Sequence, residues 1–176
     1  MNIAELKNSI RSVPDFPKKG IVFLDITTLL KNGEAFSSSV ELFFQKYKEK
    51  NISKVIGIES RGFIFGAALA YKLKCGFVPI RKPKKLPAEK IQQEYQLEYG
   101  SDAVEIHKDA IERGEKILLV DDLLATGGTM CAATQLVEQL GGEIIGIAFL
   151  IELNFLNGRE KLKKYDVHSL IHYEKE

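Results

Sequence analysis

The pattern of apolar and polar residues along the chain predicts short strands that alternate with amphipathic helices. Four apolar runs have the length of buried strands, at 55–58, 77–80, 117–120 and 143–150. Helical spacing of apolar residues predicts helices at 3–11, 34–50, 63–73 and 130–140. A last short strand is expected within 154–176. Because strands alternate with helices, we expect an α/β fold whose mostly parallel sheet is covered on both faces.

Two segments interrupt this alternation. Residues 12–20 contain two prolines, so we expect irregular chain between the first helix and the sheet. Residues 81–100 contain many lysines and two prolines, followed by a strand-like stretch at 95–100. A polar excursion of that size inside a compact α/β domain indicates a functional flap. The sequence shows no internal repeat and no second domain, so we expect one domain over 1–176.

Composition narrows the function classes. The chain has 25 basic and 24 acidic residues, so no overall field favours nucleic acid or a membrane surface as a partner. It has no apolar run long enough to span a membrane, and its first residues do not have the build of a signal peptide. Cys75 and Cys131 lack the spacing of a zinc or redox site. We therefore expect buried thiols in a reducing compartment, by default the cytoplasm.

The most informative stretch is 117–129, which reads ILLVDDLLATGGT. Asp121 and Asp122 follow the apolar run, where a parallel strand is expected to end, and open α/β sheets bind ligands at that edge. The small residues 125–129 can close their backbone N–H groups around an anion at the start of the next helix. Carboxylates beside a phosphate cradle suit a sugar phosphate. The alternative is an ordinary strand-to-helix turn with an N-capping threonine.

Two further stretches carry charge that suits an anion. The turn at 59–62, Glu-Ser-Arg-Gly, follows a strand at the same sheet edge, and its backbone N–H groups and Arg61 could bind a second anion. A plain turn with a solvated arginine explains this stretch equally well when it is taken alone. Residues 81–85 place four cations in five positions, a pattern that is usually a solvated charge run.

The remaining candidates are less specific. Residues 95–100 alternate like one strand of a hairpin, which leaves Glu98 either solvated or turned onto the site. Residues 16–27 include an apolar stretch that is consistent with an edge strand, in which Phe23 belongs to the core more often than to a ligand site.

Residues 117–129 resemble the signature of the phosphoribosyltransferases, in which an apolar strand, two acidic residues and a small Thr/Gly loop follow one another. The resemblance implies the type I phosphoribosyltransferase fold, with a flap at about 81–100 and a small hood formed by the N-terminal segment. It implies that Asp121 and Asp122 face the ribose hydroxyls of phosphoribosyl pyrophosphate. The residues expected to hold its 5′-phosphate are Ala125, Thr126, Gly127, Gly128 and Thr129.

The same resemblance makes the turn at 59–62 the pyrophosphate loop. It places a non-proline cis peptide between Ser60 and Arg61, and it gives Arg61 a part in catalysis as well as in binding pyrophosphate. Residues 81–87 look like the adenine-specific branch of the family, whose cations reach pyrophosphate, partly from a neighbouring subunit. The cations expected to do so here are Arg81, Lys82 and Lys85.

The flap and the N-terminal segment complete the implied site. Residues 97–100 match the family's flap tip, which makes Glu98 the candidate for proton transfer at the purine and Tyr99 the candidate for lid closure. The segment at about 12–28 resembles the family's base-recognition segment. There the Val22 carbonyl would accept from the exocyclic amine of adenine, and the Leu24 amide would donate to a ring nitrogen. The expected stacking residues are Phe23 on one face and Leu153 on the other.

One departure from the family concerns Leu24, since relatives commonly have a basic residue there. Recognition through the backbone survives this change, but any ionic role of the side chain does not.

The resemblance covers nearly the whole chain and implies transfer of a phosphoribosyl group to N9 of adenine, giving AMP and pyrophosphate in purine salvage. Mg²⁺ would be carried by the substrate's pyrophosphate and ribose hydroxyls, with no ligand supplied directly by the protein. The family is usually homodimeric. Another purine phosphoribosyltransferase would lack the Val22–Phe23 segment and the Glu98 flap. A non-catalytic sensor of phosphoribosyl pyrophosphate typically adds an N-terminal DNA-binding domain, whereas this chain begins directly with the enzyme-like segment.

Overall fold

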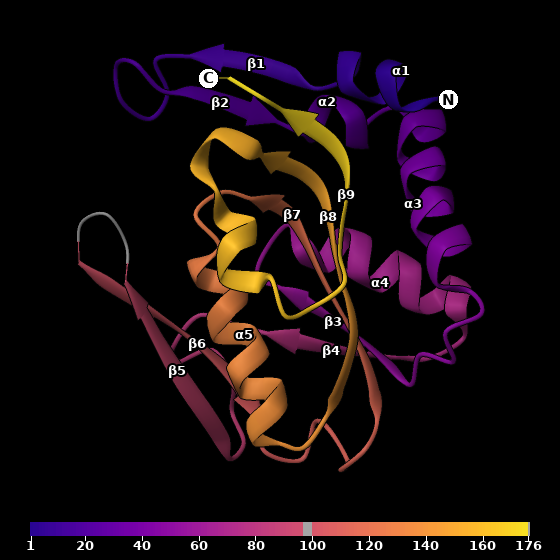
Figure 1. The fold of residues 1–176 in the computed structure, drawn as a ribbon, viewed down its shortest axis with the longest axis vertical. Coiled ribbons are helices and arrows are strands. Elements are labelled where there is room, and N and C mark those ends of the chain that lie inside the picture. The colour runs from indigo at the N-terminus through magenta and orange to yellow at the C-terminus, as the bar shows by residue number, and fades with distance from the viewer. Residues whose placement is uncertain (97–99, 176) are drawn as a thin grey trace.

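A five-stranded parallel sheet organises the chain (Figure 1). The computed structural model describes residues 1–96 and 100–175. In the order in which they lie side by side, the strands are β4 (Gly76–Ile80), β3 (Lys54–Ile58), β7 (Lys116–Leu124), β8 (Glu143–Leu153) and β9 (Val167–Tyr173). All four neighbouring pairs are parallel, so the expected α/β fold with a parallel central sheet is confirmed.

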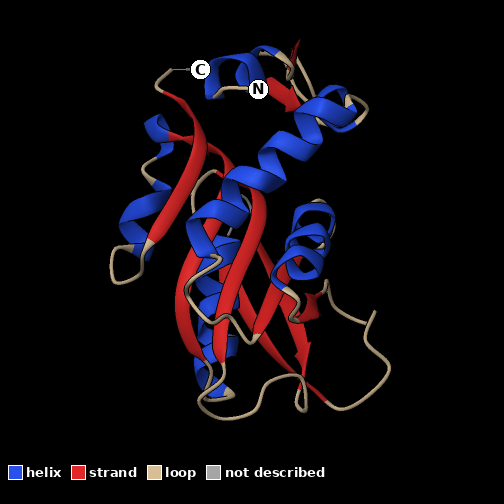
Figure 2. Ribbon diagram, turned by 90° about the vertical axis from the view of Figure 1, so that its right-hand side faces the viewer, coloured by secondary structure: helices blue, strands red, loops and turns tan. Residues whose placement is uncertain are grey.

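Helices cover both faces of this sheet (Figure 2). The long helices are α3 (Gly33–Tyr47), α4 (Gly62–Leu73) and α5 (Gly128–Gln139). Leu118 of β7 belongs to the core that also contains Phe43 of α3 and Phe65 of α4. Its neighbour Leu119 belongs to the second core, which contains Leu136 of α5. Because β7 is buried on both faces, its sequence is a continuous apolar run rather than an alternating one.

The N-terminal residues form a small hood above the carboxyl ends of the strands (Figures 1 and 2). It consists of α1 (Ile3–Asn8), β1 (Arg11–Pro14), β2 (Val22–Asp25) and α2 (Thr27–Leu30), with β1 and β2 paired antiparallel. The prediction of a helix at 3–11 was wrong at its end, because Arg11 already pairs with Asp25 in the hairpin. Lys7 of α1 donates to the carbonyl of His172 at 2.6 Å, which ties the hood to β9.

A second hairpin projects beside α5 in Figure 1. It pairs β5 (Lys90–Gln96) with β6 (Ser101–His107), and Gln93 of β5 accepts from Gln139 of α5 at 3.3 Å. The excursion predicted at 81–100 therefore continues to His107, since the strand that returns from the tip lies beyond residue 100.

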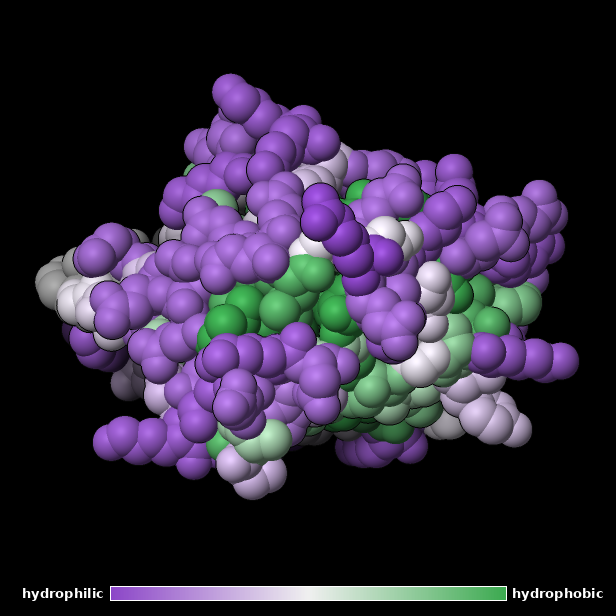
Figure 3. Space-filling view, turned by 90° about the horizontal axis from the view of Figure 1, so that it is seen from below, coloured by the Kyte–Doolittle hydropathy of each residue, from purple (hydrophilic) through white to green (hydrophobic). Residues whose placement is uncertain are grey.

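The two ends of the sheet differ in what covers them. Figure 3 shows the face at the bottom of Figure 1, where hydrophilic residues surround a central group of hydrophobic ones. The carboxyl ends of β7 and β8 point the other way, towards the hood.

The chain after β8 forms two 3₁₀ helices, η1 (Asn154–Leu156) and η2 (Gly158–Leu162), and then strand β9. In the described ranges, no helix is both long and apolar enough to cross a bilayer.

Candidate active site

The candidate site lies where the connections of β3 and β7 leave the sheet in opposite directions. Helix α4 follows β3 on one face, and α5 follows β7 on the other face. In open α/β sheets such a switch point between neighbouring strands forms a crevice for a ligand. The turn at 59–62 and the loop at 125–129, both singled out from the sequence, flank this crevice.

Strand β7 is longer than predicted. The sequence placed its end at Asp121, but β7 pairs with β8 as far as Leu124 and with β3 only as far as Val120. The strand continues because Leu123 and Leu124 still pair with Ile151 and Glu152 of β8 after the pairing with β3 has ended. Asp121 and Asp122 therefore stand where β7 has lost one of its two neighbours.

Asp122 is 5% exposed and forms an ion pair with Arg61, whose Nε lies 2.7 Å from its Oδ2. Burial raises the pKa of both Asp121 and Asp122, and the charge of Asp122 raises the pKa of Asp121 further, while Arg61 acts in the opposite direction. The turn packs closely against the strand at Gly62, where a Cβ atom would lie 2.8 Å from the carbonyl oxygen of Val120 and 2.9 Å from Oδ1 of Asp121. Only glycine fits this contact without a shift of the backbone.

The loop Ala125–Thr129 encloses a small cavity of about 80 Å³ at the N-terminus of α5. Gly127 is the N-cap residue and has φ +77°, a conformation that L side chains rarely adopt. Its carbonyl accepts from the Cys131 amide at 2.9 Å, which starts the helix. A helix N-terminus with small residues around it is suited to an anion.

Gly158 packs against the backbone of this loop, a contact that the sequence pattern did not identify. A Cβ atom on Gly158 would lie 2.1 Å from the carbonyl oxygen of Ala125, and one on Gly127 would lie 2.5 Å from the carbonyl oxygen of Gly158. The available signal was the Asn157-Gly158 dipeptide, which is typical of a tight turn. Asn157 indeed has a positive φ of 51°.

The cis peptide implied by the resemblance lies one bond earlier than predicted. It joins Glu59 to Ser60, not Ser60 to Arg61. The carbonyls of Ser60 and Arg61 already accept from the first amides of α4, at 3.3 and 3.2 Å, so the reversal of the chain lies ahead of Ser60.

Two of the three predicted pyrophosphate cations meet at Glu59, which the sequence analysis did not single out. Arg81 donates to both oxygens of Glu59, at 3.2 and 3.3 Å, and Lys85 donates at 2.7 Å. The backbone amide of Lys82 adds a fourth bond at 2.9 Å. Burial raises the pKa of Glu59, but these bonds outweigh it and hold the pKa at about 2. The ammonium of Lys82 instead donates to Tyr95 at 2.6 Å and pairs with Asp102 on the hairpin.

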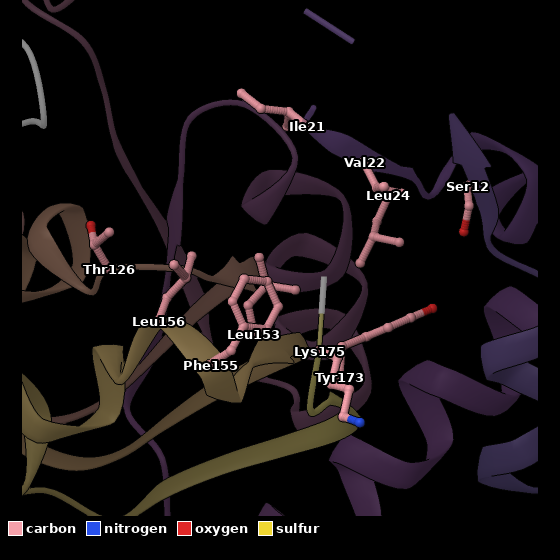
Figure 4. A pocket seen from close by; sticks show the side chains of 10 residues that line it. All are labelled: Ser12, Ile21, Val22, Leu24, Thr126, Leu153, Phe155, Leu156, Tyr173 and Lys175. Atoms are coloured by element: carbon pink, nitrogen blue, oxygen red, sulfur yellow. The ribbon is translucent and has the colours of Figure 1, made fainter. Parts of the chain in front are cut away.

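A cavity of about 760 Å³ lies between the hood and the carboxyl end of β8 (Figure 4). Three of the four predicted adenine residues line it: Val22, Leu24 and Leu153. The residues that the sequence analysis missed are Ser12, Ile21, Phe155, Leu156, Tyr173 and Lys175. Thr126 of the phosphate loop also lines this cavity, and it lines the 80 Å³ cavity as well. The two cavities therefore share a wall.

Phe23 lies on the face of β2 opposite Val22 and Leu24, as the two-residue alternation of a strand requires. Its ring packs edge-on against Phe16, with 5.2 Å between centroids, and lies 5.4 Å from the guanidinium carbon of Arg61. The predicted stacking residue therefore faces the pyrophosphate-loop arginine.

Glu98 and Tyr99, predicted for catalysis and lid closure, lie outside the described residues. The last described pair of the hairpin is Gln96 with Ser101. Within the described ranges, no group of three or more His, Cys, Asp or Glu side chains is arranged to hold a metal ion.

Curated sequences similar to this chain share one description. An adenine phosphoribosyltransferase of Koribacter versatilis is 59% identical over 170 residues, which cover 97% of this chain and 93% of the relative. One from Acidobacterium capsulatum is 60% identical and covers 98% of this chain and 96% of its own length.

Solved structures with a similar fold carry the same description. The adenine phosphoribosyltransferase of Thermoanaerobacter pseudethanolicus superposes with a TM-score of 0.95 at 53% identity, covering 98% of this chain and all of that one. The enzyme from Saccharomyces cerevisiae, complexed with adenine and an imino-altritol bisphosphate, gives a TM-score of 0.91 at 42% identity and covers 96% and 97%. The family model for the phosphoribosyl transferase domain matches residues 25–174. The chain therefore belongs to the phosphoribosyltransferase family.

Proposed function

We infer that the protein transfers the 5-phosphoribosyl group of phosphoribosyl pyrophosphate to N9 of adenine, releasing pyrophosphate and forming AMP for purine salvage. The observation that carries this is the position of Thr126, which lines both the apolar cavity under the hood and the small cavity of the phosphate loop. A base site and a phosphate site that share a wall fit a nucleoside monophosphate. The similarity to adenine phosphoribosyltransferases over almost the whole chain favours adenine over another purine, and an enzyme over a sensor.

Asp121 and Asp122 are proposed to accept hydrogen bonds from the two ribose hydroxyls. Their raised pKa values fit this role, because two buried carboxylates side by side gain from any donor that approaches them. The 5′-phosphate would sit in the loop of Ala125, Thr126, Gly127, Gly128 and Thr129, where backbone amides and the dipole of α5 favour an anion. The trypanosomal relative with a TM-score of 0.89 was solved with AMP, pyrophosphate and ribose 5-phosphate.

The pyrophosphate would be held by Ser60 and Arg61 of the turn, with Arg81 and Lys85 supplying further charge. Arg61 also has a proposed part in catalysis, since it lies between Asp122 and the ring of Phe23 and can stabilise charge that develops on the leaving group. Lys82 can join this set only by giving up its bonds to Tyr95 and Asp102.

Adenine is proposed to bind along β2. Within the described residues this strand pairs only with β1, so its other edge leaves backbone groups for a ligand. The Val22 carbonyl would accept from the exocyclic amine, and the Leu24 amide would donate to a ring nitrogen. Leu153 closes the cavity from the side of β8. Phe23 does not line this cavity, and its ring lies against Phe16 and Arg61, so its proposed stacking on the purine requires the base to reach the opposite face of β2.

In the reaction, the bond between ribose C1 and pyrophosphate breaks as purine N9 forms its bond to C1, and the purine gives up a proton. Glu98 is proposed to handle this proton, and Tyr99 to help exclude water, which would otherwise hydrolyse the activated ribose. Support for this comes from their position in the sequence, because Gln96, the last described residue of β5, lies beside Gly128 of the phosphate loop, and Glu98 and Tyr99 come two and three residues later.

Magnesium fits the donor set as a substrate-borne ion. Mg²⁺ would be carried by the pyrophosphate and ribose hydroxyls of the substrate, and Asp121 and Asp122 would act on it only through the hydroxyls that they bind, with no ligand supplied directly by the protein. The bound ion would neutralise charge on the leaving group.

A homodimer in the cytoplasm is proposed for the working enzyme. Ile64 and Tyr71 lie two helical turns apart on α4, and they are 38% and 86% exposed, which suits an apolar contact with a second copy. Both cysteines, Cys75 and Cys131, are free thiols, as is typical of a reducing compartment. We propose neither a nucleic acid nor a membrane as a partner, since the charges nearly balance.

The test is to incubate the protein with phosphoribosyl pyrophosphate, Mg²⁺ and one purine at a time, and to identify the nucleotide formed. AMP from adenine supports the proposal. IMP or GMP as the main product would show a different purine specificity. Binding of phosphoribosyl pyrophosphate without any nucleotide product would favour the sensor.

A further inference from the structure

The loop proposed for the 5′-phosphate packs against the first residue of η2, Gly158. The backbone of Gly158 approaches Ala125 and Gly127 so closely that neither glycine leaves room for a Cβ atom. The preceding 3₁₀ helix contributes Phe155 and Leu156 to the wall of the cavity under the hood. Residues 154–158 thus touch both proposed subsites, for the base and for the phosphate.

Arg159 fixes this segment to the sheet. It donates through Nε to Oε1 of Glu152 at 2.9 Å and through Nη2 to Oε2, so the ion pair is bidentate. A third bond runs from Nη1 to the Val167 carbonyl at 2.8 Å. Glu152 is only 4% exposed, and its Oε2 also accepts from the hydroxyl of Ser169 at 2.6 Å. Such a fully paired buried group holds a single geometry.

We propose that Arg159 is a positioning residue for the phosphate loop: its ion pair with Glu152 holds Gly158 against Ala125 and Gly127, and so sets the shape in which the loop receives a phosphate. Arg159 acts here through Gly158. The inference rests on the proposed assignment of the loop to the 5′-phosphate.

A small displacement of Gly158 is enough to change the affinity of the loop for a phosphate. A misplacement of about 1 Å in a group that positions a substrate can cost up to about a hundred-fold in rate or affinity. The cations at Glu59 belong to a different part of the chain, so loss of the Arg159 anchor should leave the binding of pyrophosphate alone unchanged.

The test compares Arg159→Met with the double variant Glu152→Met/Arg159→Met. The single variant leaves the buried Glu152 carboxylate with only the Ser169 hydroxyl and the more distant His172 ring, and is expected to lower Tm, whereas replacing both charges by apolar groups restores much of the stability. If Arg159 positions the loop, ribose 5-phosphate should bind about ten- to a hundred-fold more weakly to both variants than to wild type. The Kd of pyrophosphate should stay within two-fold of the wild-type value. The matched control is Lys164→Met, which removes an exposed ion pair with Glu138 at 2.9 Å and should leave both Kd values unchanged.

A purely structural role for Arg159 predicts instead that the affinity for ribose 5-phosphate recovers in the double variant together with Tm, and that result would overturn the inference. Ribose 5-phosphate binding by the wild-type protein is the separate test of the proposed function. If wild type does not bind it, the assignment of the loop fails; if wild type and both variants bind it equally, only the role of Arg159 fails.

Discussion

Nε of Arg61 lies 2.7 Å from Oδ2 of Asp122, so an ion pair joins the turn after β3 to the part of β7 that no longer pairs with β3. The same guanidinium lies 5.4 Å from the Phe23 ring of the hood. One side chain therefore connects the proposed sites for pyrophosphate, ribose and base.

Replacement of Asp121 or Asp122 by asparagine should weaken the handling of phosphoribosyl pyrophosphate. Each variant loses a charge-assisted hydrogen bond to a hydroxyl, which is worth roughly 1.5–3 kcal/mol, or about ten- to a hundred-fold in kcat/KM. Asp122→Asn also loses the ion pair with Arg61. Steady-state kinetics with varied phosphoribosyl pyrophosphate would measure this. Asp109→Asn, an exposed change after the second hairpin, is the control, and wild-type kinetics in both site variants would show that the pair is structural.

Glu59 should make the stability of the protein depend on pH in the acid range. Its pKa in the folded protein is about 2, below the ordinary value of 4.5, so the ionised form stabilises the fold. That contribution is complete above pH 4.5 and is lost as the pH falls towards 2. Glu59→Gln should therefore lower Tm at pH 7, and the difference from wild type should shrink at pH 3.

Thermal unfolding at several pH values would test this, with Glu89→Gln as the matched control. Glu89 pairs with Lys108 at 3.1 Å, but its side chain is 84% exposed, so we expect a much smaller effect. A difference between Glu59→Gln and wild type that stays constant from pH 7 to pH 3 would contradict the prediction.

Glu98→Gln separates chemistry from binding. The amide keeps the size of the side chain but cannot accept a proton, so kcat should fall by about 10² to 10⁴. Binding of phosphoribosyl pyrophosphate should change little, because its proposed contacts lie on β7 and on the Arg61 turn. Since product release limits many enzymes, the measurement is single-turnover formation of AMP. Glu94→Gln, an exposed change on β5, is the control. A wild-type single-turnover rate would remove Glu98 from the chemistry.

The sheet could be predicted from the sequence because its signals are local. The apolar run at 117–120 and the helical spacing after Met130 identified β7 and α5, and the order of the elements identified a parallel sheet. The hairpin of β1 and β2 was missed in part, because both strands are short, β1 is mostly exposed, and neither carries an alternating apolar pattern.

The missing parts of the site depend on contacts between distant segments. Gly158 supports a loop more than thirty residues earlier, and nothing in its own neighbourhood reveals that contact. In the sequence, Glu59 has the pattern of an ordinary turn residue. The cations that donate to it, Arg81 and Lys85, come from the segment after β4, and only the fold brings them close to Glu59. The side of β2 on which Phe23 lies could not be read from the sequence before the pairing with β1 was known.

The most direct test of the adenine assignment is the ratio of kcat/KM for adenine to that for hypoxanthine, with guanine as a second competitor. Hypoxanthine and guanine carry an oxygen where adenine has its amine, and a protonated N1 where adenine has an acceptor. Against the Val22 carbonyl and the Leu24 amide, both hydrogen bonds become mismatched, and such buried mispairing discriminates by about 10⁴ or more. A ratio of that size is the predicted result, and comparable values for adenine and hypoxanthine would contradict the account.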